Sequence, residues 1–513
     1  MPFLLSSIPS LAQAQTWLDQ RGISGFLAAL ILALNLFFIL PIVYRRYFHP
    51  LSRFPGPFLA SISNLHQCYR YLCGNEHEYY LGLHEKYGPI VRFGPNSLMI
   101  NKPHFLPTIY HRTADKTEFY NPNFGTISLF STLKHEDHVV IKRRLGAAYA
   151  MSSVKRYEAR IDASVTQFLN GLADTYRTAD LDDWLHWFAY DVISAILAGK
   201  PIGFLEQRTD VRGLIASFAQ VVWPLEFLGR IPKLSLLARK TWLGRKLFTA
   251  KARDTSGIGA LMAERDVWYD EHVGHPRPET LEDSDLIYQF MAAKTADKSS
   301  TMSEYDVKAE ALLAMLGGSA TVSDALQKLF RNLLAQPRCL ALLVSEIDAA
   351  VASGHIPIPA PFTSLQTLPY LSICIRESFR LSPSTPLFPR VVPAGGVVFN
   401  EQLIPAGTAL ASSPWITMRD PEVYGEDAAI FRPERWMEVE PERKRDWDRW
   451  DFHWGFGSRT CLGKHIATIE IFKCVFELLR TFEILMNKDG ILSVRPRESN
   501  GAAKEGRTKL EMS

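Results

Sequence analysis

The sequence contains few cysteines and no Cys-x-x-Cys pair. Its 513 residues include six cysteines, and they are scattered along the chain. So sparse a set excludes a disulfide framework, and without Cys-x-x-Cys pairs the usual evidence for a zinc ribbon or a thioredoxin-like site is missing.

An excess of charge of one sign is also missing. The 57 Lys and Arg residues nearly balance 54 Asp and Glu residues, which leaves a formal net charge of +3. This balance argues against a nucleic-acid-binding coat and a solvating tail, so we expect no nucleic-acid partner.

Charge is absent altogether from one segment, residues 22–44, over 23 consecutive positions. As a helix this segment would be about 35 Å long, enough to cross a hydrocarbon core of about 30 Å. A cleavable signal peptide would have a shorter apolar region that ends at small residues, whereas this one ends at Tyr44, Arg45 and Arg46. We therefore predict a transmembrane anchor.

The residues around this segment predict its orientation. Arg45, Arg46 and Arg53 follow it, so the larger part of the chain should face the cytosol. Residues 49–57 contain three prolines and predict a stiff, extended spacer. We expect a lumenal segment over residues 1–21, an anchor over 22–44, a basic and proline-containing hinge over 45–57, and one large body over 58–513.

The body has no low-complexity linker and no internal repeat. Apolar periodicity predicts helices over residues 301–334, 336–353, 371–381 and 462–482, the first opened by a capping box at Thr301–Glu304. Short strands are expected at residues 90–94, 97–100, 391–399 and 409–413. The predicted fold class is mainly α with small β-sheets.

One segment, Trp454–Gly463, combines a cysteine with features that keep a thiol ionised. Its Gly-x-Gly is not a dinucleotide loop, because the third glycine, a preceding strand and the acidic partner are missing. Gly455 and Gly457 allow close backbone approach, Arg459 supplies a cation, and a helix is expected directly after Cys461. A single cysteine ligand suits the axial position of haem iron better than zinc, although a lone cysteine is more often an inert core residue.

The same segment resembles the haem-binding signature of the cytochrome P450 superfamily, Phe-Gly-x-Gly-x-Arg-x-Cys-x-Gly, with Trp454 at the phenylalanine position. Three further segments resemble family motifs in the expected order: Gly317–Thr321 the oxygen-binding helix, Glu377–Arg380 the Glu-x-x-Arg helix, and Pro433–Trp436 the Pro-Glu-Arg-Phe segment. Residues 138–153 also resemble fungal members such as pisatin demethylase. The resemblance covers essentially the whole chain, and it implies a haem domain behind one N-terminal transmembrane helix.

The resemblance implies roles for individual residues. Cys461 would be the axial ligand of haem b, held in a loop shaped by Gly455, Gly457 and Gly463. The propionates would be bound by Arg459, Arg390, His138 and Lys142, with Arg143 as a competing candidate. Glu377, Arg380 and Arg435 would form a buried charge cluster, whereas a lone pair of this spacing is usually a solvated surface pair.

The distal helix departs from the family's pattern. Thr321 stands where the family's threonine assists oxygen activation, but Ala320 replaces the acidic residue that usually precedes it. Ser319, Ser323, Asp324 or a water chain could take over proton delivery. The substrate pocket is expected at residues 121–131, 218–228 and 385–388 and around Met315, all mainly apolar.

The implied activity is a haem-thiolate monooxygenase that uses O2 to oxidise a small lipophilic substrate in fungal secondary metabolism. No flavin or nicotinamide domain is recognisable, so the electrons should come from a separate NADPH-cytochrome P450 reductase at the endoplasmic reticulum membrane, with the catalytic domain on the cytosolic side of a single-pass anchor. Two alternatives remain: a rearrangement or dehydration on the same fold, suggested by Ala320, and a non-catalytic haem-binding protein.

Overall fold

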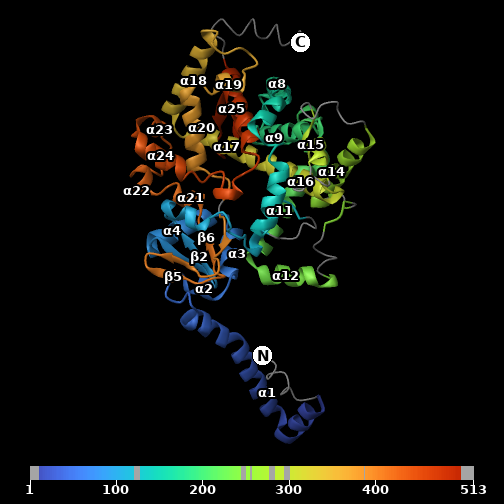
Figure 1. Cartoon of the computed structure of the whole chain (residues 1–513), viewed down its shortest axis with the longest axis vertical. Helices are drawn as coiled ribbons and strands as arrows, with labels where there is room; N and C mark the ends of the chain where they lie inside the picture. The colour runs from blue at the N-terminus through green and yellow to red at the C-terminus, as the bar shows by residue number, and fades with distance from the viewer. Residues whose placement is uncertain are drawn as a thin grey trace.

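A computed structural model of the chain describes residues 11–120, 127–243, 250–252, 254, 257–275, 284–293, 301–385 and 387–497. In this structure one long helix projects away from a large, mainly helical body (Figure 1).

The projecting helix is α1 (Leu11–Val43), which continues into one π-helical turn, η1 (Tyr44–Phe48). The segment Gly25–Phe48 is long and apolar enough to cross a membrane, and none of its most apolar window is buried against the body. A second segment, Val211–Arg230, passes the same test of length and composition, but its helix packs against others of the body.

The hinge differs from the extended spacer that its prolines predict. Residues 49–54 form turns, in which the Ser52 amide donates to the His49 carbonyl at 2.8 Å. These turns allow Leu51 and Phe54 to be buried in the body. Residues 55–57 have no regular secondary structure, with Pro57 extended, and α2 (Phe58–Ile62) begins directly after them.

Three long helices of the second half confirm the bounds predicted from apolar periodicity to within two residues. They are α18 (Pro337–Ala352), α20 (Pro369–Leu381) and α25 (Lys464–Thr481). The helix expected over 301–334 is instead divided at Ser319 into α16 (Glu304–Gly318) and α17 (Ala320–Leu334). The capping box also differs from the prediction, because it joins Ser303 to Asp306.

The remaining helices surround these elements. They are α3 (Leu65–Leu72), α4 (Glu76–Tyr87), α5 (Leu106–Ile109), α6 (His135–Leu145), α7 (Met151–Val154), α8 (Glu158–Thr175), α9 (Leu181–Ala198), α10 (Phe204–Gln207), α11 (Leu214–Arg230), α12 (Pro232–Lys240), α14 (Gly257–Gly274), α15 (Leu286–Ala292), α19 (Phe362–Leu365), α21 (Pro414–Thr417), α22 (Pro421–Tyr424), α23 (Arg435–Glu438) and α24 (Pro441–Arg449).

The strands form three small sheets among the described residues. The largest has the order β1 (Ile90–Gly94), β2 (Ser97–Ile100), β6 (Ala409–Ala411) and β3 (Arg390–Val391), with β2 and β6 parallel. The others pair β4 (Val397–Phe399) with β5 (Gln402–Ile404), and β7 (Phe482–Met486) with β8 (Leu492–Pro496). The single strand predicted over 391–399 is therefore two strands in different sheets, because Pro393 and the positive-φ Gly395 and Gly396 turn the chain between them.

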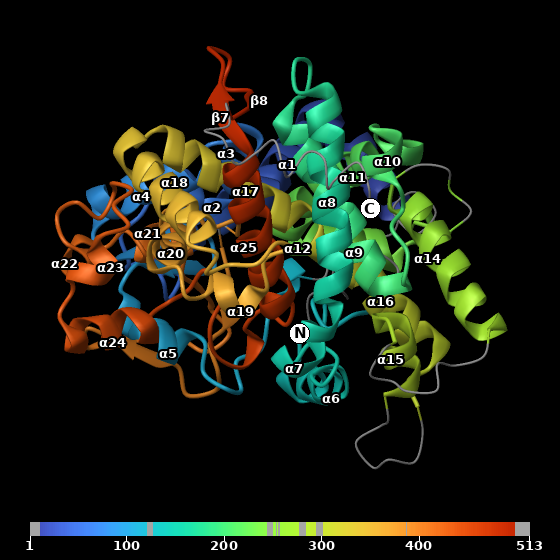
Figure 2. The same cartoon turned by 90° about the horizontal axis from the view of Figure 1, so that it is seen from above.

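The main core lies among the helices. Helix α25 contacts α8 and α17, and α9 packs against α8, α16 and α17 (Figure 2). The buried apolar side chains of these helices form one cluster, so the two halves of the chain share one apolar interior. Because α25 begins three residues after Cys461, its packing fixes the position of that cysteine relative to the α16–α17 break.

Candidate active site

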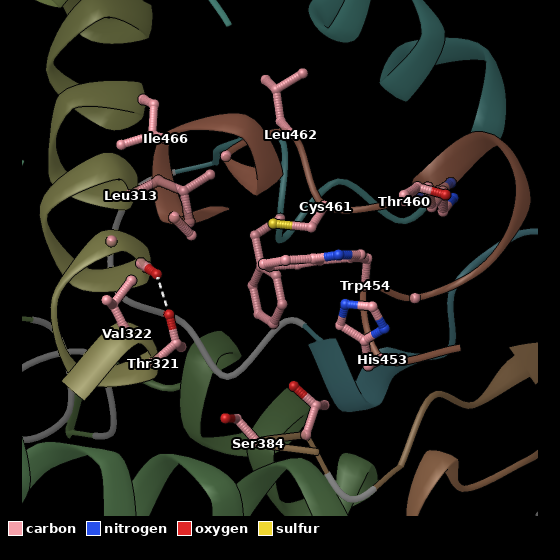
Figure 3. A pocket seen from close by; sticks show the side chains of 18 of the residues that line it. Leu313, Thr321, Val322, Ser384, His453, Trp454, Thr460, Cys461, Leu462 and Ile466 are labelled. Atoms are coloured by element: carbon pink, nitrogen blue, oxygen red, sulfur yellow. Dashed lines mark hydrogen bonds between the residues drawn. The ribbon is translucent and has the colours of Figure 1, made fainter. Parts of the chain in front are cut away.

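The body encloses one large cavity of about 340 Å³ between the α16–α17 helices and the loop before α25 (Figure 3). Its lining includes Cys461, Thr321 and the segments 382–385 and 453–455, together with many apolar side chains. Residues far apart in the sequence therefore meet around one space.

The Cys461 side chain points into this cavity (Figure 3). Its backbone amide donates to the Trp454 carbonyl at 2.8 Å, which closes the preceding loop. Burial raises the pKa of the Cys461 thiol, whereas the amides of Gly463 and Lys464 and the nearby Lys142 oppose this rise. Peptide N–H groups beside a sulfur stabilise a thiolate that binds a metal.

The loop before Cys461 requires glycine at one position above all. Gly457 has a φ of +67°, and a Cβ atom there would lie 2.5 Å from the Tyr110 carbonyl oxygen. Gly455 also has a positive φ, +76°, but a Cβ atom would meet nothing closer than 3.6 Å. Gly463 lines the cavity, and a Cβ atom added to it would meet no atom within 4 Å.

Basic side chains gather at one side of the cavity. Lys116, His138, Arg390 and Arg459 all line it. Burial and mutual repulsion lower the pKa of His138 to about 3 and that of Lys116 well below its usual value. The Nε atom of Arg459 is buried without a hydrogen-bond partner. Buried cations without matching anions indicate that a ligand supplies negative charge, and the two propionates of haem fit this requirement.

Lys142 and Arg143 contribute differently. The Lys142 ammonium donates to the Ser458 carbonyl at 2.5 Å, so it stabilises the cysteine loop without lining the cavity. Arg143 is exposed on the same helix, α6. Of the basic residues expected from the sequence to bind the propionates, His138, Arg390 and Arg459 border the cavity directly.

The opposite wall contains the break between α16 and α17. Thr321 donates its hydroxyl hydrogen to the Gly317 carbonyl at 2.7 Å, the hydrogen bond that is dashed in Figure 3. Gly318 packs so closely on α9 that a Cβ atom would lie 2.7 Å from Cγ1 of Ile193, whereas Gly317 borders open space. Glycine is therefore required at the two positions for different reasons. At position 318 it allows close packing between helices, and at position 317 it leaves space in the cavity.

None of the side chains suggested in place of an acid at position 320 lines the cavity. Ser319 is fully buried and donates to the Met315 carbonyl at 2.8 Å. Ser323 is fully buried as well, and Asp324 pairs with Lys328 at 2.7 Å. Among the described residues, the only carboxyl groups of the cavity lining are those of Glu310 and Glu470.

Glu377, Arg380 and Arg435 form a fully buried cluster beneath the cavity loops. Glu377 accepts hydrogen bonds from Arg380 at 2.8 and 2.9 Å and from Arg435 at 2.9 Å. The Trp436 indole and the Arg432 amide donate to the same carboxylate. The cluster joins α20 to residues 424–436, so the solvated surface pair that the spacing alone suggests is excluded.

The expected pocket walls are found in part. Leu129, Phe130, Thr385 and Phe388 line the cavity. Leu313, Ala314 and Gly317, on either side of Met315, line it as well, although Met315 itself does not. The described side chains of residues 218–228 do not line it. Residues 121–126 and Pro386 lie outside the described residues. Sequence reasoning missed Lys116, Glu310 and Glu470, and the only available signal was that Glu310 and Glu470 interrupt apolar helix faces.

Comparison with known proteins agrees with this site. The family model of cytochrome P450 matches residues 54–511. The chain is similar to the cytochrome P450 monooxygenase cicH of Emericella nidulans, with 32% identity over 467 residues, covering 88% of this chain and 92% of the relative. It is 30% identical to pisatin demethylase of Fusarium vanettenii, covering 89% of this chain and 87% of the relative.

A longer relative, the cytochrome P450 monooxygenase mpaDE' of Penicillium brevicompactum, is 30% identical, and the chain spans about half of its length, 53%. The family match and the relatives both cover most of this chain, and the cysteine loop, cations and broken distal helix surround one cavity. The chain therefore belongs to the cytochrome P450 family and is a haem-thiolate oxidoreductase.

Proposed function

We propose that the protein is a membrane-anchored monooxygenase that inserts one oxygen atom of O2 into a small lipophilic substrate in fungal secondary metabolite biosynthesis. The observation that supports this most strongly is the shared cavity, with Cys461 on one wall and Thr321 on another. The cavity's largely apolar lining suits a lipophilic molecule, and the names of the similar fungal monooxygenases support the reaction class.

In this proposal Cys461 would bind the iron of haem b through its thiolate. Arg459, Arg390 and His138, together with Lys116, would bind the propionates, and Lys142 holds the cysteine loop through Ser458. When bound, a thiolate-ligated haem supplies the chemistry that cleaves the O–O bond and oxidises an unactivated C–H bond. The protein's own groups orient the substrate, exclude water and conduct protons.

Thr321 is the proposed catalytic residue of the distal wall. Its hydroxyl donates to the Gly317 carbonyl in this structure, and it could donate instead to a molecule bound in the cavity. Protons would reach it through water, because Ala320 has no ionisable group and Ser319, Ser323 and Asp324 do not line the cavity.

The proposed cellular arrangement follows from the first 57 residues. The anchor over residues 22–44 would hold the catalytic domain, residues 58–513, on the cytosolic face of the endoplasmic reticulum, with residues 1–21 on the lumenal side and the basic hinge over 45–57 between them. NADPH-cytochrome P450 reductase in the same membrane would supply the electrons. The apolar exposure of Gly25–Phe48 supports the anchor.

A second candidate function is a rearrangement or dehydration that needs no proton relay. The absence of an acid before Thr321, with no substitute in the neighbouring turn of the helix, favours this alternative. A haem-binding protein without turnover is the third candidate.

One experiment separates the three. Microsomes that contain the protein and a P450 reductase are incubated with candidate metabolites, with and without NADPH, and product masses are recorded. A gain of one oxygen atom that requires NADPH is expected. Conversion without NADPH would support the second candidate, and no conversion by a correctly loaded haem protein would support the third.

A further inference from the structure

Glu310 is a buried carboxylic acid in the wall of the cavity. It lies on α16 and is 4% exposed. Its Oε1 atom accepts a hydrogen bond from the Leu129 amide at 2.7 Å, which ties the chain between residues 127 and 131 to α16. The second oxygen of Glu310, Oε2, has no hydrogen-bond partner among the described residues. This oxygen is not fully buried, so a molecule in the cavity can reach it.

The surroundings of Glu310 offer no positive charge. Neighbours in the lining include Leu129, Leu313 and Ala314, which are apolar. The cations that face the expected propionates do not act on this carboxyl. Asp306 repels it, and the Tyr149 phenol of the cavity lining also interacts with it. Burial, slightly opposed by the Leu129 amide, raises the pKa of Glu310 to about 8.

A purely structural role would use only one of the two oxygen atoms of the Glu310 carboxyl group. Holding the Leu129 amide requires one acceptor, which a serine, an asparagine or a glutamine can provide at lower desolvation cost. A carboxylate with a free oxygen in an apolar cavity is costly to ionise unless a ligand brings a hydrogen-bond donor or a cation to it. Cavities that bind small molecules combine apolar walls with a few polar groups of this kind, which fix the ligand's orientation.

We propose that Glu310 determines substrate specificity by accepting a hydrogen bond from a donor group of the substrate, a hydroxyl or an ammonium. This inference rests on the proposed function. Glu310 and Thr321 are 321 − 310 = 11 residues apart, which corresponds to about 16 Å along the helices. The substrate is therefore elongated, with its donor group at Glu310 and the carbon to be oxidised towards Thr321.

The test uses three probes of one chain length: 1-dodecanol, dodecyl methyl ether and N,N-dimethyldodecylammonium. Their dissociation constants are measured from the change in haem absorbance of the full-length holoprotein at pH 8.5, above the raised pKa of Glu310 of about 8. The wild type should bind the alcohol about tenfold more tightly than the ether, equivalent to about 1.4 kcal/mol. If the ammonium binds more tightly still, the natural donor is an amine; if it binds more weakly, the donor is a hydroxyl.

Glu310→Gln isolates the role of the free oxygen. Glutamine keeps an oxygen for the Leu129 amide, but it places an NH2 donor where Oε2 faces the cavity. The tenfold preference for the alcohol should fall to about twofold or less. Glu304→Gln changes an exposed glutamate of the same helix and should keep the full preference.

An alcohol preference that persists in Glu310→Gln would show that Glu310 only anchors the loop, and the proposal would be wrong. Equal binding of alcohol and ether by the wild type would overturn it without any variant, so the test holds even if Glu310→Gln fails to fold. Because binding is measured without turnover, a wild type that shows the preference but forms no product would refute the monooxygenase proposal alone.

Discussion

Replacing Glu377 by glutamine tests the buried charge cluster beneath the cavity. The side chain is fully buried and accepts hydrogen bonds from both nitrogens of Arg380 that face it, from Arg435, from the Trp436 indole and from the Arg432 amide. Glutamine keeps the shape but removes the negative charge. Arg380, also fully buried, would then face only backbone carbonyls, whereas Arg435 would keep Asp427.

The expected cost is about 3–5 kcal/mol in the free energy of unfolding, because an uncompensated charge remains buried. An exposed pair of the same spacing would cost at most about 1 kcal/mol. Haem content should fall with stability, since the cluster fixes the segment that leads to the cysteine loop, and Glu377→Ala should lose folding and haem together.

The matched control is Glu470→Gln. Glu470 is equally buried but has no cation beside it, and burial raises the pKa of this carboxyl well above its usual value. Burial therefore disfavours the ionised form of this carboxyl, and the neutral amide should change the free energy of unfolding by less than about 1 kcal/mol. Denaturant titration and the ratio of haem to protein measure both variants. A Glu377→Gln protein with wild-type stability and full haem content would refute the reasoning.

Three further predictions concern the distal wall and a buried histidine. Gly318→Ala should destabilise the protein because the added Cβ atom would collide with Ile193, whereas Gly317→Ala should leave stability unchanged and weaken ligand binding. Thermal unfolding and ligand titration compare the two variants. Equal effects of the two substitutions would contradict the different roles assigned to the two glycines. Thr321→Ala should lower the product formed per NADPH consumed, and an unchanged ratio would refute its role. His272 contacts Asp285 at 2.9 Å; burial opposes its protonation, but Asp285 and the Trp268 carbonyl together raise the pKa of His272 above 6.5. The stabilising contribution of protonated His272 is therefore complete below about pH 6.5 and is lost as the pH rises through the higher folded-state pKa. The melting temperature of the wild type should exceed that of His272→Gln by more at pH 6 than at pH 8.5. A difference in melting temperature that does not depend on pH would contradict this assignment.

The parts of the site that carry a local pattern could be predicted from the sequence. The glycines, Arg459 and Cys461 lie within nine residues, and the reason for glycine at position 457 became visible only through the contact with Tyr110. Glu377 and Arg380 are neighbours on one helix by spacing alone. Helix lengths followed apolar periodicity, because long amphipathic helices pack one face against the core.

The remaining features depend on tertiary contacts that leave no local pattern. Lys116 is one lysine in a loop, and its importance comes from burial beside Arg390 and Arg459. Beside the break at Ser319, Gly318 packs on Ile193 and the Thr321 hydroxyl donates to the Gly317 carbonyl, and both contacts are visible only in the folded chain. Glu310 is one acid on a helix until the fold places the Leu129 amide and an apolar cavity beside it.

The most direct test of the central claim is the reduced carbon-monoxide difference spectrum of Cys461→Ser beside Cys474→Ser, a fully buried cysteine on α25 that does not line the cavity. Only Cys461 borders the cavity among the six cysteines, all of which are free. Cys461→Ser should lose the thiolate-dependent Soret band, and Cys474→Ser should keep it. A Cys461→Ser protein that retains this band would contradict the assignment of Cys461 as the haem ligand.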